Sequence, residues 1–408
     1  MRKNIVLVLF IFGIIVHLVG QVREIFPASG PFVFKEMYKP QVIDARSEAL
    51  GGTSILSSTG GNFVFNNPAL LSNLSQKNIQ LGSRAIYGKE EYKHNNDNYN
   101  SDYPMHYKLN GLSFGMPLKF QNFKFGIGAG YRTYYDLGKN RHYEDQDSDY
   151  VNDHFGHGGL STLVLGGGFN FQNIFFIGFS SNLPFFSKYS KEVESIDSYG
   201  DEYKYKTEST LKGTFFTIGS SYKLNKVITF GLRLRTGFSL EWKEKDSGNE
   251  ENLIVPPEFG LALELKPIPS LKFYTEWLTR NFSKYKMDNN NDEYYLYDDL
   301  GNGFALRTGF EAGTNWLFRG GFFMQSLPIY ESKNADDGEV VKVKTPKKEY
   351  GFTTGLGFKI YSKISVDFFS VYSFLTNNQS YYDPYWGLDS TKYFTYQMKI
   401  GSTIGYNF

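Results

Sequence analysis

The chain has 408 residues, a formal net charge of +1 and no cysteine. Disulfide bonds and cysteine-ligated metals are therefore excluded, and the near-zero charge gives no electrostatic basis for binding nucleic acid. Aromatic residues make up 18% of the chain, with 38 Phe and 31 Tyr beside 42 Gly. This mix is typical of a transmembrane β-barrel, where aromatic side chains form girdles at both membrane interfaces and glycine lets backbone pack closely inside.

Residues 1–20 are predicted to be a secretory signal peptide. Arg2 and Lys3 form a basic start, residues 5–16 are almost wholly apolar, and Gly20 offers a cleavage position before Gln21. A retained membrane anchor is the alternative, and the shortness of the apolar stretch disfavours it. Beyond it no run of about 18 apolar residues occurs, so no membrane-spanning helix is expected.

Residues 21–76 lack long alternation and are expected to form a small hatch that plugs the barrel lumen. Their apolar side chains cannot belong to the wall and need burial; they are Phe63, Val64, Phe65, Leu70 and Leu71. Glycines predicted on the inner face of the wall leave room for them: Gly126, Gly128, Gly130, Gly231 and Gly237.

Residues 77–408 are predicted to form an all-β, fourteen-stranded antiparallel barrel. Six tight turns separate long alternating segments, at 121–122, 172–173, 225–226, 267–270, 313–315 and 362–363. Seven long polar stretches are expected as outer loops, at 89–101, 141–153, 188–201, 244–252, 287–302, 331–348 and 377–390. Thirteen connections give fourteen strands, and an even number places both barrel ends on the periplasmic side.

The alternation fixes which face meets lipid. In residues 228–242 the even positions are mostly apolar, and Leu232, Leu234, Phe238, Leu240 and Trp242 are predicted to share the lipid face. An arginine facing lipid at the bilayer centre would cost about 2–4 kcal/mol, so the charged positions are assigned to the lumen. The predicted lumenal charges are Arg233, Arg235, Glu241, Arg307, Glu311 and Arg319.

The last fifteen residues predict the closing strand. From Phe394 to Phe408 the alternate positions are mainly apolar and aromatic, and the residues between them are polar or small. The pattern resembles the closing strand of bacterial outer-membrane barrels, which ends in Phe and carries the assembly signal. Tyr406 and Phe408 are therefore expected to engage the barrel-assembly machinery.

The N-terminal region resembles the start of the FadL-type family of outer-membrane transporters of hydrophobic compounds. Such proteins have a Gly-Gly-Ala-type stretch, a short spacer and then Asn-Pro-Ala-Gly-Leu. Gly51 and Gly52 match the first part, although Thr53 replaces the usual Ala. The second part is matched by Asn67, Pro68 and Ala69, although Leu70 stands where Gly is common.

The resemblance implies a fourteen-stranded barrel with an N-terminal hatch, a bacterial outer-membrane location and transport of fatty acids or aromatic hydrocarbons. The expected contacts are a hydrophobic ligand, outer-membrane lipid and lipopolysaccharide. The hatch motif and ligand path would comprise Gly51, Gly52, Phe63, Phe65, Asn67, Pro68, Ala69 and Leu70. An alternative is a PorV-like component of type IX secretion that binds or shuttles exported proteins.

Other chemistries have weaker signals. The carboxylates in residues 144–153 and 288–293 would suit calcium, but they lack the glycine and distal glutamate of a calcium-binding hand and are interpreted as surface loops. His154 and His157 beside Asp153 are too few for a zinc site. The chain has no nucleophile elbow or phosphate loop, so neither enzymatic activity nor a cofactor is expected.

Overall fold

The computed structural model describes residues 42–408 apart from short gaps at 95–96, 121–122, 139, 146–149, 197–200, 246–249, 290–291, 296–300, 329–330, 335–339, 344–345, 361–362 and 384–386. The predicted signal peptide lies outside the described residues. So do the side chains of Asp153, His154 and the carboxylates of residues 144–149.

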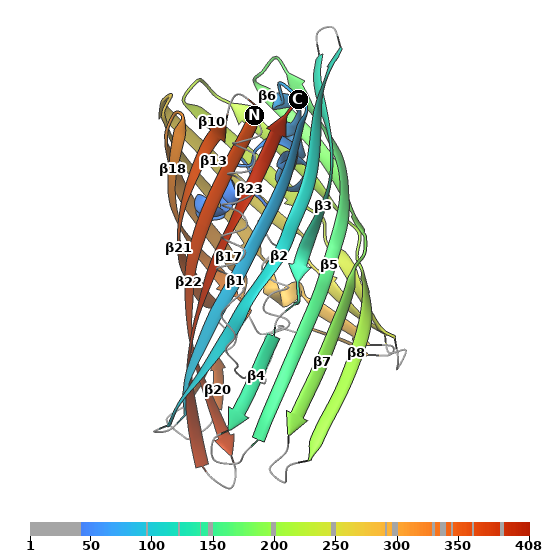
Figure 1. The fold of residues 1–408 in the computed structure, drawn as a ribbon, viewed down its shortest axis with the longest axis vertical. Helices are drawn as coiled ribbons and strands as arrows, with labels where there is room; N and C mark the ends of the chain where they lie inside the picture. Colours follow the sequence, from blue (N-terminus) through green and yellow to red (C-terminus); the bar gives the residue numbers. More distant parts are fainter. Residues whose placement is uncertain are drawn as a thin grey trace.

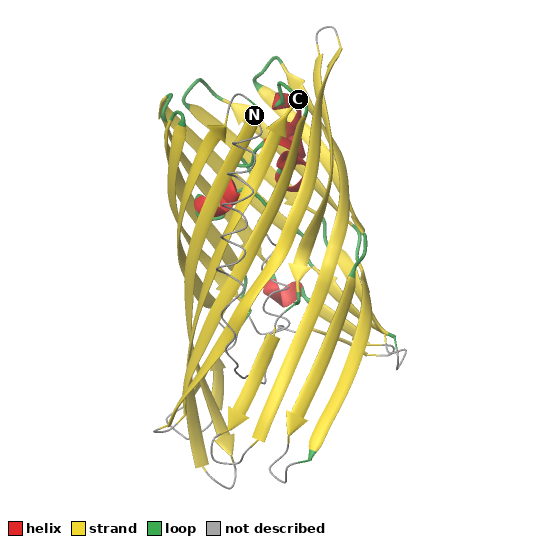
Figure 2. Cartoon of the chain, viewed as in Figure 1, coloured by secondary structure: helices red, strands yellow, loops and turns green. Residues whose placement is uncertain are grey.

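Fourteen antiparallel strands form a closed barrel, as the sequence predicted (Figures 1 and 2). Closure is direct, because β1 (Asn78–His94) pairs with β2 (Asp97–Phe120) on one side and with β23 (Gly387–Asn407) on the other. The other wall strands are β3 (Phe123–Asp136), β5 (Tyr150–Phe171), β6 (Phe175–Pro184), β9 (Phe215–Lys223), β10 (Ile228–Arg235), β13 (Glu258–Ile268), β14 (Leu271–Arg280), β17 (Gly303–Gly313), β18 (Trp316–Leu327), β21 (Lys347–Ile360) and β22 (Ile364–Asp383).

Strand ends flank the positions of all six predicted tight turns, and these strand ends lie at the same end of the barrel as the carboxyl terminus (Figure 1). At one of them, Gln172 and Asn173 both have positive φ, of 53° and 58°. Residues 121–122 and 361–362 are themselves outside the described part. Short turns mark the periplasmic end of such barrels, so the long hairpins at the other end face outward.

The described parts of the long polar stretches are mainly strands, so their prediction as loops was wrong in detail. β22 and β23 contain 20 and 21 residues, about twice the number that a spanning strand needs. Shorter strands continue the wall outward from several of the wall strands. Together with residues 151–158 of β5 we call these shorter strands the outer extension. They are β4 (Asn140–Asp145), β7 (Lys188–Ile196), β8 (Glu202–Lys212), β11 (Phe238–Glu244), β12 (Glu250–Val255), β15 (Lys286–Asn289) and β16 (Asp292–Tyr295). β19 (Glu331–Asn334) and β20 (Val340–Val343) form a separate hairpin. Polar residues did not end these strands, because Tyr, Thr and Val among them favour extended pairing.

Breaks separate the outer extension from the part of the wall that lies on the periplasmic side of it, which we call the membrane belt. β10 ends at Arg235 and β11 begins at Phe238, while Pro256 and Pro257 separate β12 from β13. Between β6 and β7, Phe186 has a φ of 51°. Successive side chains of a strand point to opposite faces. A break that adds one residue therefore moves all the following side chains to the other face of the wall.

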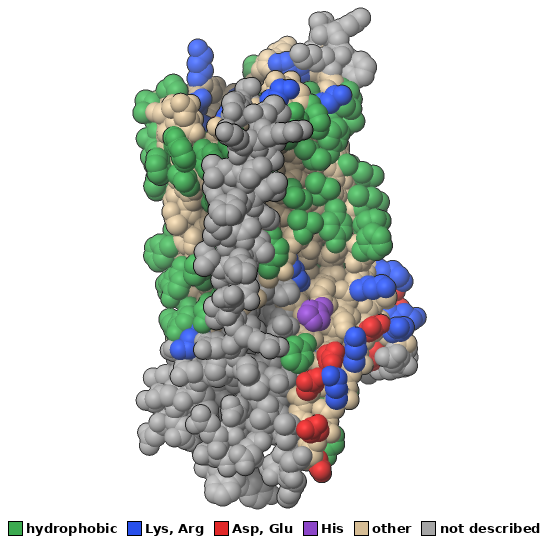
Figure 3. Space-filling view, viewed as in Figure 1, with side chains coloured by type: hydrophobic (Ala, Val, Ile, Leu, Met, Phe, Trp, Pro, Cys, Tyr) green, Lys and Arg blue, Asp and Glu red, His purple; other side chains and the backbone are tan. Residues whose placement is uncertain are grey.

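The two zones bury opposite kinds of side chain. In the belt, Phe230 and Leu234 face outward and Arg233 is buried inside, whereas in the extension Phe238 and Leu240 are buried inside and Ser239 is exposed. Figure 3 shows hydrophobic side chains over the upper wall and charged side chains gathered on the lower right. Apolar residues outside suit lipid and polar residues outside suit water, so the outer membrane boundary lies near the breaks.

Short helices occupy the lumen. They are α3 (Ala45–Ala49), η1 (Gly60–Asn62), α4 (Phe63–Asn66) and η2 (Pro68–Asn73), while η3 (Phe282–Lys284) lies between β14 and β15. Val64, Phe65 and Leu71 are fully buried and pack with Ile43 and with Val164 of β5. In the described part of the chain, none of the helices has the length and apolar character needed to span a membrane.

Candidate functional site

Gly51 and Gly52 form the end of the first lumenal turn. Both have positive φ, 75° and 77°, a region that glycine enters without steric cost. Gly51 lies against the backbone of β17 and β18, where a Cβ atom would clash, and its N–H donates to the Thr353 hydroxyl at 2.8 Å. The motif is thus a close approach of the N-terminal segment, residues 42–76, to the wall.

The Asn67-Pro68-Ala69 motif begins η2. The Asn67 side chain accepts a hydrogen bond from the Ala69 N–H at 3.3 Å and donates to the carbonyls of Ile55 and Ser220. Pro68 occupies the first turn, where its missing N–H costs nothing. Asn67 therefore joins two parts of the N-terminal segment to β9. Leu70 is buried and packs with Leu50 and Ile55, and Phe63 is partly buried against the same cluster.

A row of wall glycines receives this motif. Gly126, Gly168, Gly178 and Gly219 are successive register partners on four adjacent strands, and the backbone of Pro68 to Leu71 or the Asn67 side chain lies against each of them. A signal was present in the sequence, because each glycine stands a few residues from a predicted periplasmic turn. Of the five glycines predicted to leave room for the hatch, four adjoin the N-terminal segment: Gly126, Gly128, Gly130 and Gly231. The fifth, Gly237, lies at a strand break and is exposed.

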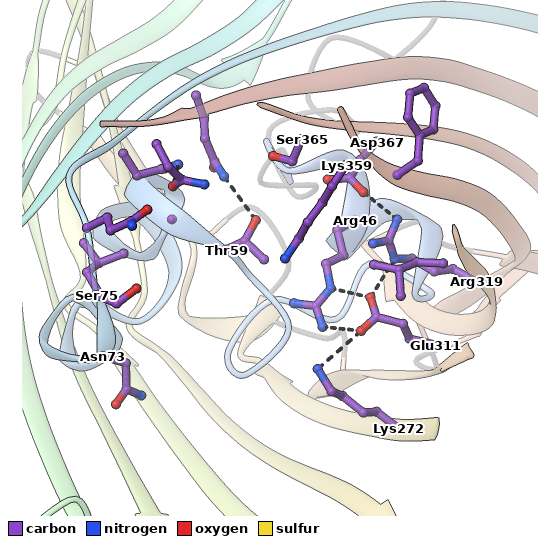
Figure 4. Close-up of a pocket in the computed structure, with 18 residues that line it drawn as sticks. Arg46, Thr59, Asn73, Ser75, Lys272, Glu311, Arg319, Lys359, Ser365 and Asp367 are labelled. Atoms are coloured by element: carbon purple, nitrogen blue, oxygen red, sulfur yellow. Dashed lines mark hydrogen bonds and ion pairs between the residues drawn. The ribbon is translucent and has the colours of Figure 1, made fainter. Parts of the chain in front are cut away.

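Buried ion pairs fix α3 to the wall near the periplasmic mouth. Arg46 donates to Glu311 at 2.6 and 2.9 Å, and Arg319 donates to Glu311 at 2.8 Å and to Asp367 at 2.7 Å. Lys272 lies 3.4 Å from Glu311. Figure 4 shows these side chains beside a cavity of about 340 Å³ that they help to line.

Asp44 caps α3 next to this network. Its carboxylate accepts hydrogen bonds from the N–H groups of Arg46 and Thr59, at 3.0 and 3.1 Å. Burial, and then the nearby charge of Asp367, raises the pKa of Asp44 to about 6. A second pocket, of about 200 Å³, lies between the end of the N-terminal segment and β2, β3 and β5.

The mid-lumen holds the other predicted charges. Arg233 and Arg235 donate to Glu258 at 3.0 and 3.1 Å. Arg307 donates to the Gly52 carbonyl at 2.8 Å and lies 3.4 Å from Glu276. The carboxylate partners Glu258 and Glu276 stand opposite Arg235 and Arg307 in the strand register, which local alternation does not determine.

Glu276 joins the wall to the N-terminal segment as well. Its carboxylate accepts the N–H groups of Ser54 and Ile55, at 2.6 and 2.8 Å. Wall charges on β14 and β17 therefore hold this segment in place.

Glu241 is not lumenal, and that prediction was wrong. The break at residues 236–237 reverses the phase, so Glu241 lies on the outer face of β11 and pairs with Lys212 at 2.5 Å, with 30% of its side chain exposed. The same reversal turns Phe238 and Leu240, predicted to face lipid, toward the lumen.

An apolar cluster fills the lumen at the level of the outer extension, and we call it the aromatic cluster. The described residues that form it are Tyr134, Tyr135, Leu137, Leu160, Tyr189, Leu211, Phe215, Phe238, Leu240, Leu253, Val255, Phe282, Tyr285 and Met287, with Trp242 packed beside them. Phe215 and Phe238 stack with ring centroids 4.8 Å apart, and Tyr134 lies 4.5 Å from Phe215. This cluster is not predictable from the sequence, because Phe238 and Leu240 continue the alternation of the lipid-facing residues before them.

Tyr406 and Phe408 end the closing strand on the outer face. They are 37% and 58% exposed, and their rings meet edge-on with centroids 4.9 Å apart. The Phe408 N–H donates to the Lys77 carbonyl at 3.0 Å, so the last residue takes part in barrel closure. This position is accessible from the membrane, and the role in assembly stays a prediction.

Among the described residues, no set of three or more His, Asp or Glu side chains is arranged to hold a metal ion.

The barrel is closed, the outer face of its membrane belt is apolar, and the first wall strand begins where the last one ends, at the periplasmic rim. These features define a bacterial outer-membrane β-barrel protein. Residues 1–255 match the profile of the BamG family, which covers more than half of the chain. The chain belongs to the BamG family.

Solved structures with the same fold have low sequence identity. A Pseudomonas aeruginosa FadL homologue aligns with a TM-score of 0.61 and 11% identity, over 90% of this chain and 98% of that one. The P. putida toluene transporter TodX gives 0.60 and 13%, over 90% and 98%. The Ralstonia pickettii toluene transporter TbuX gives 0.53 and 11%, over 91% and 100%. A comparison with curated proteins gave no match.

Proposed function

We propose that this outer-membrane barrel binds hydrophobic compounds and passes them through a plugged lumen. The observation that supports it best is the aromatic cluster, which places Phe215 and Phe238 inside the barrel. Lumenal apolar side chains at the outward end are suited to capture apolar solutes. The solved structures with the same fold include a FadL homologue and toluene transporters, which favours fatty acids or aromatic hydrocarbons as ligands.

Equilibrium binding tests this function. The folded protein in detergent is titrated with a fluorescent fatty acid and, separately, with toluene. Phe238→Leu should weaken binding, since it changes the aromatic cluster, while Phe230→Leu on the lipid face of the same wall is the control. Absence of binding by the native protein, or equal affinity of both variants, would contradict the proposal.

The N-terminal segment is proposed to act as the hatch. The glycine row and the ion pairs of Arg46 support this role, because they seat the segment within the lumen. Deleting residues 22–72 should leave a barrel that conducts ions in planar bilayers, while the intact protein stays closed. Wide conductance by the intact protein, or none by the deletion, would refute a hatch.

A second candidate is a role with the barrel-assembly machinery, favoured by the name of the matched family. The firmly packed lumen suits a scaffold as well as a transporter. The intact protein should then co-purify with the central barrel of that machinery, and its depletion should lower the folded yield of other outer-membrane barrels. A normal yield after depletion would remove this candidate. PorV-like carriage of exported proteins stays a prediction.

A further inference from the structure

Hydrogen-bond donors gather on the lumenal wall between the N-terminal segment and the aromatic cluster. We call them the arginine–hydroxyl patch, and they are Arg132 of β3, Thr162 of β5, Ser180 and Asn182 of β6, Thr217 of β9 and Arg235 of β10. Strand register makes them neighbours, since Arg132 pairs with Thr162, Ser180 with Thr217, and Thr217 with Arg235. Five adjacent strands therefore present one continuous polar surface.

Most of these groups are buried without enough partners. The six side chains are at most 4% exposed. Among the described residues, no partner is found for the hydroxyls of Thr162, Ser180 and Thr217, the Asn182 Nδ2, or the Nε atoms of Arg132 and Arg235. Buried polar groups are normally satisfied, so a concentration of this kind points to something that completes it.

The charge around the patch is unbalanced. Five buried arginines share this part of the lumen with two carboxylates, a difference of three positive charges; the residues are Arg132, Arg233, Arg235, Arg280 and Arg307 with Glu258 and Glu276. No carboxylate in the described part lies within ion-pair distance of Arg132, whose guanidinium donates instead to Asn182 at 2.8 Å and to the Phe65 carbonyl at 3.5 Å. Uncompensated buried charge is costly, so an anion is expected.

Two arginines of the patch lie against the same aromatic ring. The guanidinium carbons of Arg132 and Arg235 lie 4.8 and 5.1 Å from the ring centroid of Tyr134, which belongs to the aromatic cluster. Arg235 also lies 5.9 Å from the Phe215 ring. The patch thus adjoins the aromatic cluster at Tyr134, whose ring both arginines contact.

We propose that the arginine–hydroxyl patch is a phosphate-binding site. Guanidinium and hydroxyl donors match the oxygens of a phosphate, and a doubly charged group offsets more of the excess charge than a carboxylate does. The phosphate belongs to an amphiphile whose apolar part reaches the aromatic cluster, or it is free inorganic phosphate. The site stands independently of whether the barrel passes hydrophobic compounds.

Calorimetric titration of the folded, delipidated protein tests the site with two probes, inorganic phosphate and a short-chain phosphatidic acid. Arg132→Gln and Arg235→Gln should each lower affinity by on the order of tenfold or more, as expected for a lost charge-assisted hydrogen bond. Arg132→Lys should keep most of the affinity. The control is Arg84→Gln, since Arg84 is equally buried but pairs with Asp136 at 3.0 Å. Heat-modifiable gel mobility verifies that each variant is folded.

Binding of phosphatidic acid alone assigns the site to a lipid headgroup, and equal binding of both probes assigns it to free phosphate. Either result supports the proposal when the Arg132 and Arg235 variants bind more weakly than the Arg84 control. No binding of either probe by the native protein, or equal affinity in all three glutamine variants, overturns it.

Discussion

The membrane belt and the outer extension use the same alternating strands but turn opposite faces inward. In the belt the inner face of β10 carries charges, with Arg233 paired to Glu258, and Leu234 faces outward. In the extension the interior is the aromatic cluster, and Glu241 pairs with Lys212 outside. The surrounding solvent explains the difference, since a strand turns its apolar side away from water wherever water lies. One barrel therefore combines a membrane-protein wall with a core like that of a soluble protein.

The extension should lose the most stability when its interior is truncated. Leu240 is fully buried, so Leu240→Ala should destabilise the protein by about 2–5 kcal/mol through lost burial and a cavity. The measurement is urea unfolding in lipid vesicles, followed by tryptophan fluorescence. Ser239→Ala, outward on the same strand, is the control and should change stability by less than about 0.5 kcal/mol. Similar losses in both variants would mean that β11 has no preferred interior face.

The membrane boundary is tested by the same charge placed on either side of the break. Phe230→Arg should cost about 2–4 kcal/mol, because Phe230 faces lipid near the middle of the belt, between the turn at residues 225–226 and the break at 236–237. Ser239→Arg, beyond the break and also outward, should fold like the native protein because it meets water. Folded yield by heat-modifiable mobility reports both.

Arg233→Leu gives a third comparison in this zone. It should be milder than Phe230→Arg, since Glu258 keeps Arg235 and Arg280 as partners. Equal tolerance of all three changes would place the break outside the membrane boundary.

The polar interior of the belt region should respond to pH through Asp44. Its pKa is raised from 3.8 to about 6 in the folded protein, so the folded state holds the proton more tightly than the unfolded chain. The free energy of unfolding that comes from this tighter proton binding is fully present below about pH 4, and it is lost as the pH rises through 6. Asp44→Asn should remove a difference of at most about 3 kcal/mol between pH 4 and pH 7. Unfolding curves at both pH values, compared between variant and native protein, measure it; an unchanged pH difference would argue against the role of Asp44.

The outer charges of the extension should matter least. Lys212 is 60% exposed, so its pair with Glu241 is solvated and screened by salt. Lys212→Gln should leave the unfolding midpoint unchanged within error at physiological ionic strength. A large loss would show that this face is covered, by membrane or by a partner, instead of by water.

Local chemistry made much of the barrel predictable. The turns at residues 172–173 and 225–226 stand between alternating segments, and the placement of Arg307, Glu311 and Arg319 inside follows from the cost of charge in lipid. The Asn67-Pro68 turn was also readable, because Pro at a first helical turn and Asn as its cap are local preferences. The polar stretches misled, because composition alone does not say whether two polar segments pair.

By itself, the sequence determined the strand count, the closed antiparallel wall and the lipid-facing phase of the belt, since each follows from alternation over neighbouring residues. The tertiary structure alone decided where that phase reverses. Breaks such as that at residues 236–237 shift the face of a strand without interrupting its sequence pattern, so Phe238 and Leu240 look lipid-facing in the chain and lie inside the barrel. It also decided which charges meet, because Arg132 and Arg235 become neighbours only through the register of five strands. Alternation is a local property, whereas the solvent on each side of a strand and the identity of its neighbours depend on the whole closed sheet.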